Sequence, residues 1–558
     1  MPTDSRAVPL THRTDQAFPK LSPDQMARVA RQGRMRPIAK GEVLIESGAA
    51  TLPFFVVTRG GLKIVQNPGT KEKLIAEHGP GEFTGETNML SGRPSLVEIR
   101  ASEAGEVIEL QRERLLALVQ TDAELSEIIM RAFIHRRVEL IAQGLGDSVL
   151  IGSSHCAGTH RVKEFLTRNG QPYAYIDLDR EHDIQSLLDR FGVGIDDVPV
   201  LVVRGAQVLR SPSNQQIADS LGFNAGIDAT HLRDLVIVGA GPSGLAAAVY
   251  GSSEGLNVLV LESSMPGGQA GSSSRIENYL GFPMGISGER LTGSAYAQAL
   301  KFGTQFIVAK GAKQLTCEHR PHIVELENGE RVPSKTVIIA TGAEYRKLPL
   351  VEIARFEGAG VYYGATRVEA QVCNDEPVVV VGGGNSAGQA AVFLADHAAR
   401  HVHMLVRGAA LAETMSRYLI KRIENHPKIT LLTQTEIVAA HGDMHLARVT
   451  WRNQQTSVEE THEIRHVFVM TGAMPCTQWL NGCLVLDSKG FIKTGPDLSP
   501  EDLREAEWPL ARPPYLLETS QPGVFAVGDV RGGNIKRVAS AVGEGSIAVA
   551  FIHRVLQE

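Results

Sequence analysis

The sequence predicts an α/β protein in which two domains built on parallel sheets follow a smaller α/β module and an N-terminal β-roll. Two observations predict the parallel sheets: residues 235–244 and 378–387 each contain a β-branched apolar run, a glycine-rich turn and a helix start. A third predicts the β-roll, since short apolar runs punctuated by glycine fill residues 40–110. A chain of 558 residues exceeds one hydrophobic core, and about 150 residues per domain suggests three to four domains.

The composition gives no support for a nucleic-acid partner. The net charge is −6 and the basic residues are interspersed, so nothing supports binding to nucleic acid, and we expect small molecules or proteins as partners. Residues 1–6 lack an apolar signal segment, and no apolar run approaches the ~20 residues of a membrane span. The expected location is the cytoplasm.

Within the β-roll, glycines and charged residues follow a distinctive order. The positions that define this order are Lys40-Gly41-Glu42, Gly60-Gly61, residues 79–86 and residues 90–94. This stretch resembles the cyclic-nucleotide-binding domain, in which a Glu, matched by Glu86, works with an Arg that neutralises the cyclic phosphate. Ser95 stands where that Arg is expected, so the bidentate phosphate contact is lost and cyclic-nucleotide binding is doubtful. Two alternatives remain: Arg93 replaces the cation, or the fold is retained for contacts between domains or subunits.

A helix is predicted between residues 123 and 144, because apolar residues recur there at helical spacing. In domains of the resembling family such a helix often mediates dimerisation. Packing against its own β-roll is the alternative. No helix-turn-helix follows, so the sequence does not predict a transcription factor.

The next module runs from a strand at residues 148–151 to a proline-led strand at residues 198–203 in the order βαβαβ, with an amphipathic stretch at residues 183–191. It resembles the thioredoxin/glutaredoxin fold, in which a redox Cys at a helix N-terminus faces a cis-proline. Cys156 and Pro199 match those positions, while Thr159 replaces the second cysteine. A single thiol at a helix N-terminus can attack a disulfide but cannot resolve the mixed disulfide itself. The module is therefore either a monothiol site or a vestigial fold. Residues 211–228 contain turn formers that lead into a linker before the strand at residue 235.

The first glycine-rich turn predicts a dinucleotide site. Gly239 permits the tight turn, Gly241 lets the backbone approach a pyrophosphate, and Gly244 lets helix and strand pack closely. Pro242 and Ser243 complete the turn, and the next strand ends in Glu262, near the offset expected for an acid that binds the ribose.

The second glycine-rich turn reads G-x-G-x-x-A. It contains Gly382, Gly384, Asn385, Ser386 and Ala387. Its following strand ends in Arg407 instead of an acid, which suits a ribose carrying a 2′-phosphate and therefore NADPH, and Arg417 could join it from the next helix.

Taken together, the two Rossmann-like turns and three shorter motifs look like the low-molecular-weight thioredoxin reductase family from about residue 232 to the end. The shorter motifs are Gly267-Gly268-Gln269, Ala340-Thr341-Gly342 and Gly528-Asp529-Val530. The resemblance implies FAD and NADPH as cofactors and a homodimer. It also implies that the Gly239 turn and Glu262 hold the adenosine half of FAD, that Gln269 and Asn278 lie near the flavin, and that Asp529 binds the ribityl chain.

The cysteines depart from that family. Its disulfide-reducing members carry a C-x-x-C just before the second turn, where this chain has Gly364 and Arg367. Cys373 is expected to be a buried thiol. A pair between Cys476 and Cys483 is possible, but nothing in the sequence supports it, and Cys317 lies in no motif. Without paired thiols at the family's position, electrons cannot pass from the flavin into a protein disulfide there.

The sequence therefore predicts an NADPH-dependent FAD oxidoreductase that reduces an external acceptor directly from the flavin, such as a quinone, a ferredoxin or flavodoxin, or oxygen. One alternative is a disulfide reductase that works through Cys156, and another is a redox sensor whose N-terminal domain binds a ligand. The expected domains are a β-roll plus helix at 1–145, a glutaredoxin-like module at 146–226, a discontinuous FAD domain at 230–346 and 456–558, and an NADPH domain at 347–455. No metal site is expected.

Overall fold

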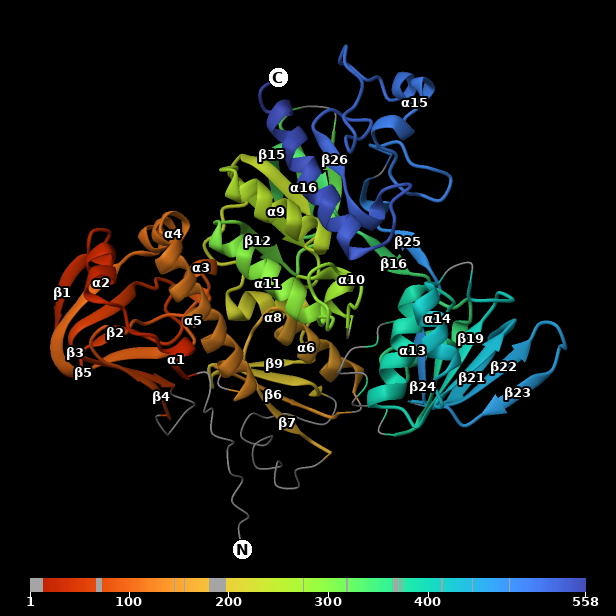
Figure 1. Ribbon diagram of the computed structural model, residues 1–558, viewed down its shortest axis with the longest axis horizontal. Coiled ribbons are helices and arrows are strands. Elements are labelled where there is room, and N and C mark those ends of the chain that lie inside the picture. The colour runs from red at the N-terminus through yellow and green to blue at the C-terminus, as the bar shows by residue number, and fades with distance from the viewer. Residues whose placement is uncertain are drawn as a thin grey trace, which may run out of the picture.

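A computed structural model shows four regions joined in one molecule (Figure 1). They are named here after the domains that the sequence predicts: the β-roll, the glutaredoxin-like module, the FAD domain and the NADPH domain. It describes residues 14–66, 73–144, 146–154, 156–179, 197–273, 275–317, 320–363, 365, 370, 373, 375–412, 415–443, 445–480 and 482–558.

The N-terminal β-roll is an antiparallel sheet in the order β1-β5-β3-β4, with β2 paired to β5. Strand β3 is its most buried element, because Phe54 to Val57 are fully buried although successive side chains point to opposite faces of the sheet. The predicted helix over residues 123–144 is confirmed as α5, which packs beside α4. The elements are α1 (Thr14–Ala17), α2 (Pro23–Ala30), β1 (Arg34–Ile38), β2 (Val43–Ile45), β3 (Phe54–Gln66), β4 (Lys73–His78), α3 (Asn88–Ser91), β5 (Glu98–Leu110), α4 (Arg112–Thr121) and α5 (Ala123–Ala142).

The glutaredoxin-like module has the sheet order β7-β6-β8-β9. Strands β6 and β7 are parallel, and β8 and β9 are antiparallel to their neighbours. Every residue of β8 is buried, as expected for a central strand covered on both faces. The amphipathic stretch predicted at residues 183–191 lies outside the described residues. The elements are β6 (Ser148–Gly152), α6 (Ala157–Arg168), β7 (Ala174–Asp177), β8 (Val200–Val203), β9 (Gln207–Arg210) and α8 (Asn214–Leu221).

The FAD domain is built on a sheet in the order β12-β11-β10-β15-β14-β13, to which β26 adds in parallel beside β15. Strands β10, β11, β12, β15 and β26 run parallel and are almost wholly buried. The elements are β10 (Arg233–Val238), α9 (Pro242–Ser253), β11 (Val258–Glu262), α10 (Gly268–Gly271), α11 (Gly288–Lys301), β12 (Gln305–Val308), β13 (Ala312–Thr316), β14 (His322–Leu326), β15 (Arg331–Ile339), β16 (Ala343–Tyr345), β25 (Ala473–Pro475), η3 (Gln478–Leu480), η4 (Gly495–Asp497), α15 (Pro500–Glu505), β26 (Val524–Ala526), η5 (Gly528–Val530) and α16 (Val538–Val555).

The NADPH domain has a parallel sheet in the order β17-β24-β18-β19-β20 and a smaller antiparallel sheet of β21, β22 and β23. The boundary predicted at residue 455 is wrong, because β24 pairs with β18 and β23 pairs with β22. The chain returns to the FAD domain through the two-stranded ribbon of β16 and β25. The elements are η2 (Val351–Phe356), β17 (Val361–Tyr362), β18 (Pro377–Val381), α13 (Asn385–His397), β19 (His401–Val406), α14 (Arg417–Glu424), β20 (Ile429–Thr433), β21 (Thr435–Gly442), β22 (Leu446–Asn453), β23 (Glu459–His462) and β24 (His466–Val469).

The hydrophobic cores divide the molecule differently from the domains. One core runs without a break from the β-roll through the glutaredoxin-like module into the FAD domain, from Leu21 to Val555. The NADPH domain has cores of its own on either side of its sheet. The three other regions therefore form one packed body. The chain enters and leaves the NADPH domain through the ribbon, and Arg422 of that domain also pairs with Glu277 of the FAD domain at 2.9 Å.

Among the described helices, α16 is long and apolar enough by composition to cross a membrane. Its position is that of a core helix, since Ala548, Val549 and Ile552 are fully buried. A Cβ at Gly545 would lie 2.2 Å from the carbonyl oxygen of Ser243, so α16 packs tightly against α9.

Candidate functional site

A cavity of about 780 Å³ lies where three of the four regions meet. The first glycine turn and the β11 end line it from the FAD domain, Asn385, Ser386 and Gln389 line it from α13, and residues of α6 line it from the glutaredoxin-like module. Its volume is within the range of about 300–1,000 Å³ typical of ligand sites. The sequence did not predict that α6 takes part.

The first glycine turn is tightly built. Gly239 has a φ of +107°, and a Cβ at Gly244 would lie only 1.9 Å from the carbonyl oxygen of Gly239. Helix α9 begins directly after Gly241. Gly268, from the next glycine pair, lies so close that a Cβ added to it would be 2.9 Å from the Cα of Gly241. Two loops thus form a cradle of bare backbone that leaves room for a pyrophosphate at a helix N-terminus. Pro242 and Ser243 line the same cavity.

Glu262 is held in place at the end of β11. One carboxylate oxygen accepts the N–H of Ala240 at 2.8 Å and the other accepts the N–H of Ser264 at 2.9 Å. Burial raises the pKa of this carboxyl above its ordinary value, while those backbone donors oppose the rise. The residue lines the cavity.

The other residues expected around FAD come together here as well. Gln269, Asn278, Thr341, Gly342 and Asp529 all line the cavity. The Gln269 side chain donates to the carbonyl oxygen of Ala343, and burial raises the pKa of Asp529.

Sequence reasoning missed Glu544, which fixes the loop that carries Asp529. Its carboxylate accepts the Gly528 N–H at 2.7 Å and also binds Arg531 and Asn534. Glu544 lies within α16, far from any recognisable motif, so no sequence signal marks it.

The second glycine turn is built on the same plan in the NADPH domain. Gly382 has a φ of +144°, and α13 begins directly after Gly384. Ala387 is buried, and the Asn385 side chain accepts the N–H of Ser416 at 2.8 Å. Arg407 and Arg417 are both exposed, and neither lines the large cavity.

Cys156 caps the N-terminus of α6, as the glutaredoxin resemblance implies. The peptide before Pro199 is cis, and a Cβ at Gly158 would lie 2.8 Å from Pro199 and 3.7 Å from the Cys156 sulfur. Thr159 is buried beneath the turn. The other end of α6 touches the FAD domain, because Arg168 donates to the carbonyl oxygens of Gly268 at 2.6 Å and Pro266 at 3.2 Å.

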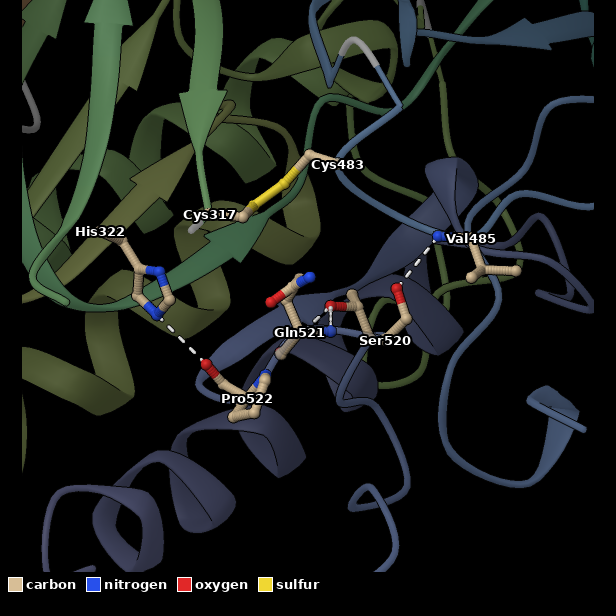
Figure 2. The surroundings of a disulfide bond; sticks show 8 residues. Cys317, His322, Cys483, Val485, Ser520, Gln521 and Pro522 are labelled. Carbon is tan, nitrogen blue, oxygen red and sulfur yellow. Dashed lines mark hydrogen bonds between the residues drawn. A yellow bond between two sulfur atoms is a disulfide. The ribbon is translucent and has the colours of Figure 1, made fainter. Parts of the chain in front are cut away.

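The structure shows a disulfide that the sequence analysis did not predict. Cys483 forms a disulfide with Cys317, 166 residues away, and Cys476 is free (Figure 2). The bond joins the end of β13 to the loop after η3, with a Cα–Cα distance of 6.2 Å. Neither cysteine lines the large cavity. Cys373 is completely buried, as expected.

Cys476 is the one cysteine among the described residues that line the cavity. Burial raises the pKa of its thiol to about 11, so the sulfur stays protonated at neutral pH and is a poor nucleophile. Gly364 and Arg367, which stand at the positions of the family's C-x-x-C, lie outside the described residues. Tyr363 just before them lines the cavity and donates to Glu357 at 3.0 Å.

Comparison with known proteins agrees with this geometry. Residues 233–545, more than half of the chain, match the family described as pyridine nucleotide-disulphide oxidoreductase. The chain belongs to that family. Residues 35–122 match the cyclic nucleotide-binding domain and residues 149–208 match glutaredoxin.

Thioredoxin reductases are similar to this oxidoreductase over its C-terminal part. The enzyme of Chlamydia pneumoniae is 33% identical over 334 residues, which are 58% of this chain and 98% of the relative. The enzyme of Ureaplasma parvum is 31% identical over 319 residues, 57% of this chain and 95% of the relative. The solved structure of Lactococcus lactis thioredoxin reductase has a TM-score of 0.52 and 26% identity, and covers 58% of this chain and all of that chain. The chain is therefore a thioredoxin reductase-like FAD- and NAD(P)H-dependent oxidoreductase with two added N-terminal domains.

Proposed function

We propose that this oxidoreductase uses NADPH to reduce an external electron acceptor that enters the large cavity, without a dithiol relay of its own. One observation carries the proposal: among the described lining residues Cys476 is the single thiol, and its pKa of about 11 keeps it protonated. Quinones, ferredoxin or flavodoxin, and oxygen are the candidate acceptors.

The residues present suit FAD. Gly241 and Gly268 offer backbone without side chains to the pyrophosphate, Glu262 offers a carboxylate to the ribose, and Asp529 stands at the far side for the ribityl chain. When bound, FAD supplies the two-electron chemistry, taking hydride from NADPH and giving electrons to the acceptor. The chain's task is to orient both dinucleotides and to exclude water.

For NADPH, the N-terminus of α13 and the exposed Arg407 and Arg417 provide the positive groups. The helix start takes the pyrophosphate, and the guanidinium groups take the 2′-phosphate through charge-assisted hydrogen bonds. Asn385, Ser386 and Gln389 bring this end of the domain to the same cavity.

An anaerobic titration with NADPH tests the proposal, with flavin absorbance as the readout. We expect two electrons per FAD, in the wild type and in the double variant C317S/C483S alike. Uptake of four electrons that falls to two in the double variant would show that the Cys317–Cys483 disulfide is part of the electron path and would overturn the proposal.

A second candidate function, disulfide reduction through Cys156, is favoured by the position of α6. Ala157 lines the cavity and packs against Gly358. A Cβ added to Gly358 would lie 2.7 Å from the Cβ of Ala157. In this cycle the Cys156 thiolate attacks a low-molecular-weight disulfide, releases one thiol and forms a mixed disulfide. Two electrons from NADPH and one solvent proton then release the second thiol and restore Cys156. C156S should abolish disulfide reduction and leave quinone reduction unchanged; equal loss of both activities would count against this candidate.

A further inference from the structure

A second cavity, of about 150 Å³, lies inside the β-roll, away from the large cavity. Its walls are mainly apolar, with Leu52, Ile64, Ile75, Met89, Val97 and Ile99 among them. His78, Glu86, Glu139 and Arg136 supply polar groups. A cavity of this volume holds about one molecule the size of benzene.

Arg136 is a buried cation that forms no salt bridge in the described part of the chain, although Glu82 and Glu86 attract it from a greater distance. The residue is 7% exposed, Nε donates to the carbonyl oxygen of Ala17 and Nη1 donates to that of Gly85, both at 2.8 Å. Nη2 is buried and has no hydrogen-bond partner among the described residues. The rings of Phe18 and Phe83 lie 5.1 and 4.9 Å from the guanidinium.

Leaving such a group without an anion is costly. Burial of a charge without a contacting counter-ion is unfavourable, and the ring faces and the more distant carboxylates offset only a part of the cost. Burial lowers the pKa of Arg136 to about 9, so the group is still a cation at neutral pH. His78 faces the same space as a neutral ring, because burial lowers its pKa to about 3. Arg136 lines the cavity but Nη2 itself is covered, so an anion in the cavity pairs with Nη2 only after a small shift of the side chains that cover it.

A cyclic nucleotide does not suit this site. Ser95 stands where the family has its arginine and carries no charge. Its hydroxyl donates to the carbonyl oxygen of Val97 at 2.7 Å. Arg93 does not replace it, since it donates to the backbone of Asn169 at 2.8 Å and to Tyr296 at 3.1 Å in the neighbouring regions. Glu86 is occupied by an ion pair with Arg137.

The charge of the lining also limits the ligand. Glu139 borders the cavity, and so does Glu86, whose charge is shared with Arg137, so a doubly charged phosphate would bring more negative charge than Arg136 offsets. A singly charged group on an apolar body fits the one free donor and the apolar walls.

We propose that the β-roll cavity binds a small monocarboxylate with a body of one ring or one short branched chain, its carboxylate on Arg136 Nη2. This ligand site is independent of the function proposed for the large cavity. The cyclic-nucleotide-binding fold has thus kept its pocket and changed its ligand class.

Calorimetry on the full FAD-loaded chain tests this, with benzoate and isovalerate as probes and benzyl alcohol as the uncharged match for benzoate. We expect saturable one-to-one binding of at least one acid. Benzoate should bind at least tenfold more tightly than benzyl alcohol, and cyclic AMP should give no heat. Absence of binding by both acids, or equal binding of the alcohol, overturns the proposal, as does tight binding of cyclic AMP.

Variants locate the site. R136M should weaken acid binding at least tenfold, while R131Q, an exposed arginine on the same helix, should leave it unchanged. Because R136M also loses the contacts to Ala17 and Gly85, V97F is made as well, to fill the cavity without touching the cation. Acid binding that survives V97F undiminished places the ligand elsewhere and overturns the proposal.

Discussion

The two glycine turns share one plan but differ in how much freedom each retains. In the first turn, the third glycine of the motif is Gly244, which has no room for an added Cβ. The strand after it ends in Glu262, which is buried and accepts two backbone hydrogen bonds. In the second, the same position is Ala387, and the strand ends in the exposed Arg407. The first turn belongs to the core shared with the N-terminal regions, and the second to a domain with its own cores. This difference suits a resident cofactor at the first turn and a coenzyme that exchanges at the second.

Gly244→Ala should break the first turn and has the largest expected effect. The added Cβ would lie 1.9 Å from a backbone oxygen, so α9 must move off its strand. We expect a loss of roughly 3 kcal/mol of apoprotein stability in urea and purification without FAD. Gly293→Ala in α11 is the control, because its Cβ would meet no atom within 4 Å in the described structure. A fully yellow, stable G244A protein would contradict the tight packing of this turn.

Glu262→Gln tests whether the locked carboxylate matters. An amide has one acceptor oxygen, so either the Ala240 or the Ser264 N–H would face an NH₂ group, at a cost of about 1–3 kcal/mol. We expect lower apoprotein stability and weaker FAD binding, measured by thermal unfolding and by FAD titration. E289Q, an exposed acid in the first turn of α11, should change neither.

The same residue predicts a pH dependence of FAD affinity. Burial raises the Glu262 pKa above 4.5, so the carboxylate takes up its proton at a higher pH than an exposed Glu. Protonation removes one acceptor, so the wild-type affinity for FAD should fall as the pH is lowered toward that pKa. Because the native state then binds this proton more tightly than the unfolded chain, Glu262 does not itself make the apoprotein labile to acid. E262Q should show a flat profile; a parallel fall in E262Q would assign the effect to another group.

Arg407→Ala tests whether the guanidinium of Arg407 binds the 2′-phosphate of NADPH. Loss of a hydrogen bond to a charged phosphate is worth about 1.5–3 kcal/mol, so the KM for NADPH should rise roughly 10- to 100-fold. The KM for NADH, which lacks the 2′-phosphate, should stay the same. Arg400→Ala, at the opposite end of β19, is the matched control. An equal rise for both coenzymes would remove Arg407 from the 2′-phosphate site.

Sequence reasoning reached both turns because their chemistry is local: Gly239, Gly244 and Gly382 are dictated by neighbours within a few residues along the chain or by an adjacent strand. It failed where distant segments meet. Cys317 and Cys483 are 166 residues apart and are brought together only by the packing of β13 against η3. The role of Arg93 between three regions and the entry of α6 into the large cavity also depend on how separate modules dock, which no periodicity or motif records.

The return to the FAD domain was predicted too early for a related reason. Strand β23 is exposed and polar, and β24 is a short apolar run, so neither shows from its own residues which sheet it joins. Only the pairing of β24 with β18 assigns it to the NADPH domain.

Gly384→Ala gives the smallest expected effect and the sharpest contrast with Gly244. Gly384 has φ −89° and ψ 175°, which any residue adopts, and an added Cβ would meet no atom within 4 Å in the described structure. Stability should therefore change by less than about 0.5 kcal/mol. The added methyl group would nevertheless stand where a pyrophosphate approaches the start of α13, so the KM for NADPH should rise a few-fold and that for NADH equally, because both carry the pyrophosphate. If stability falls, the second turn is as tightly packed as the first. If neither KM moves, the pyrophosphate does not lie against Gly384, and the resemblance between the two turns stops at the backbone.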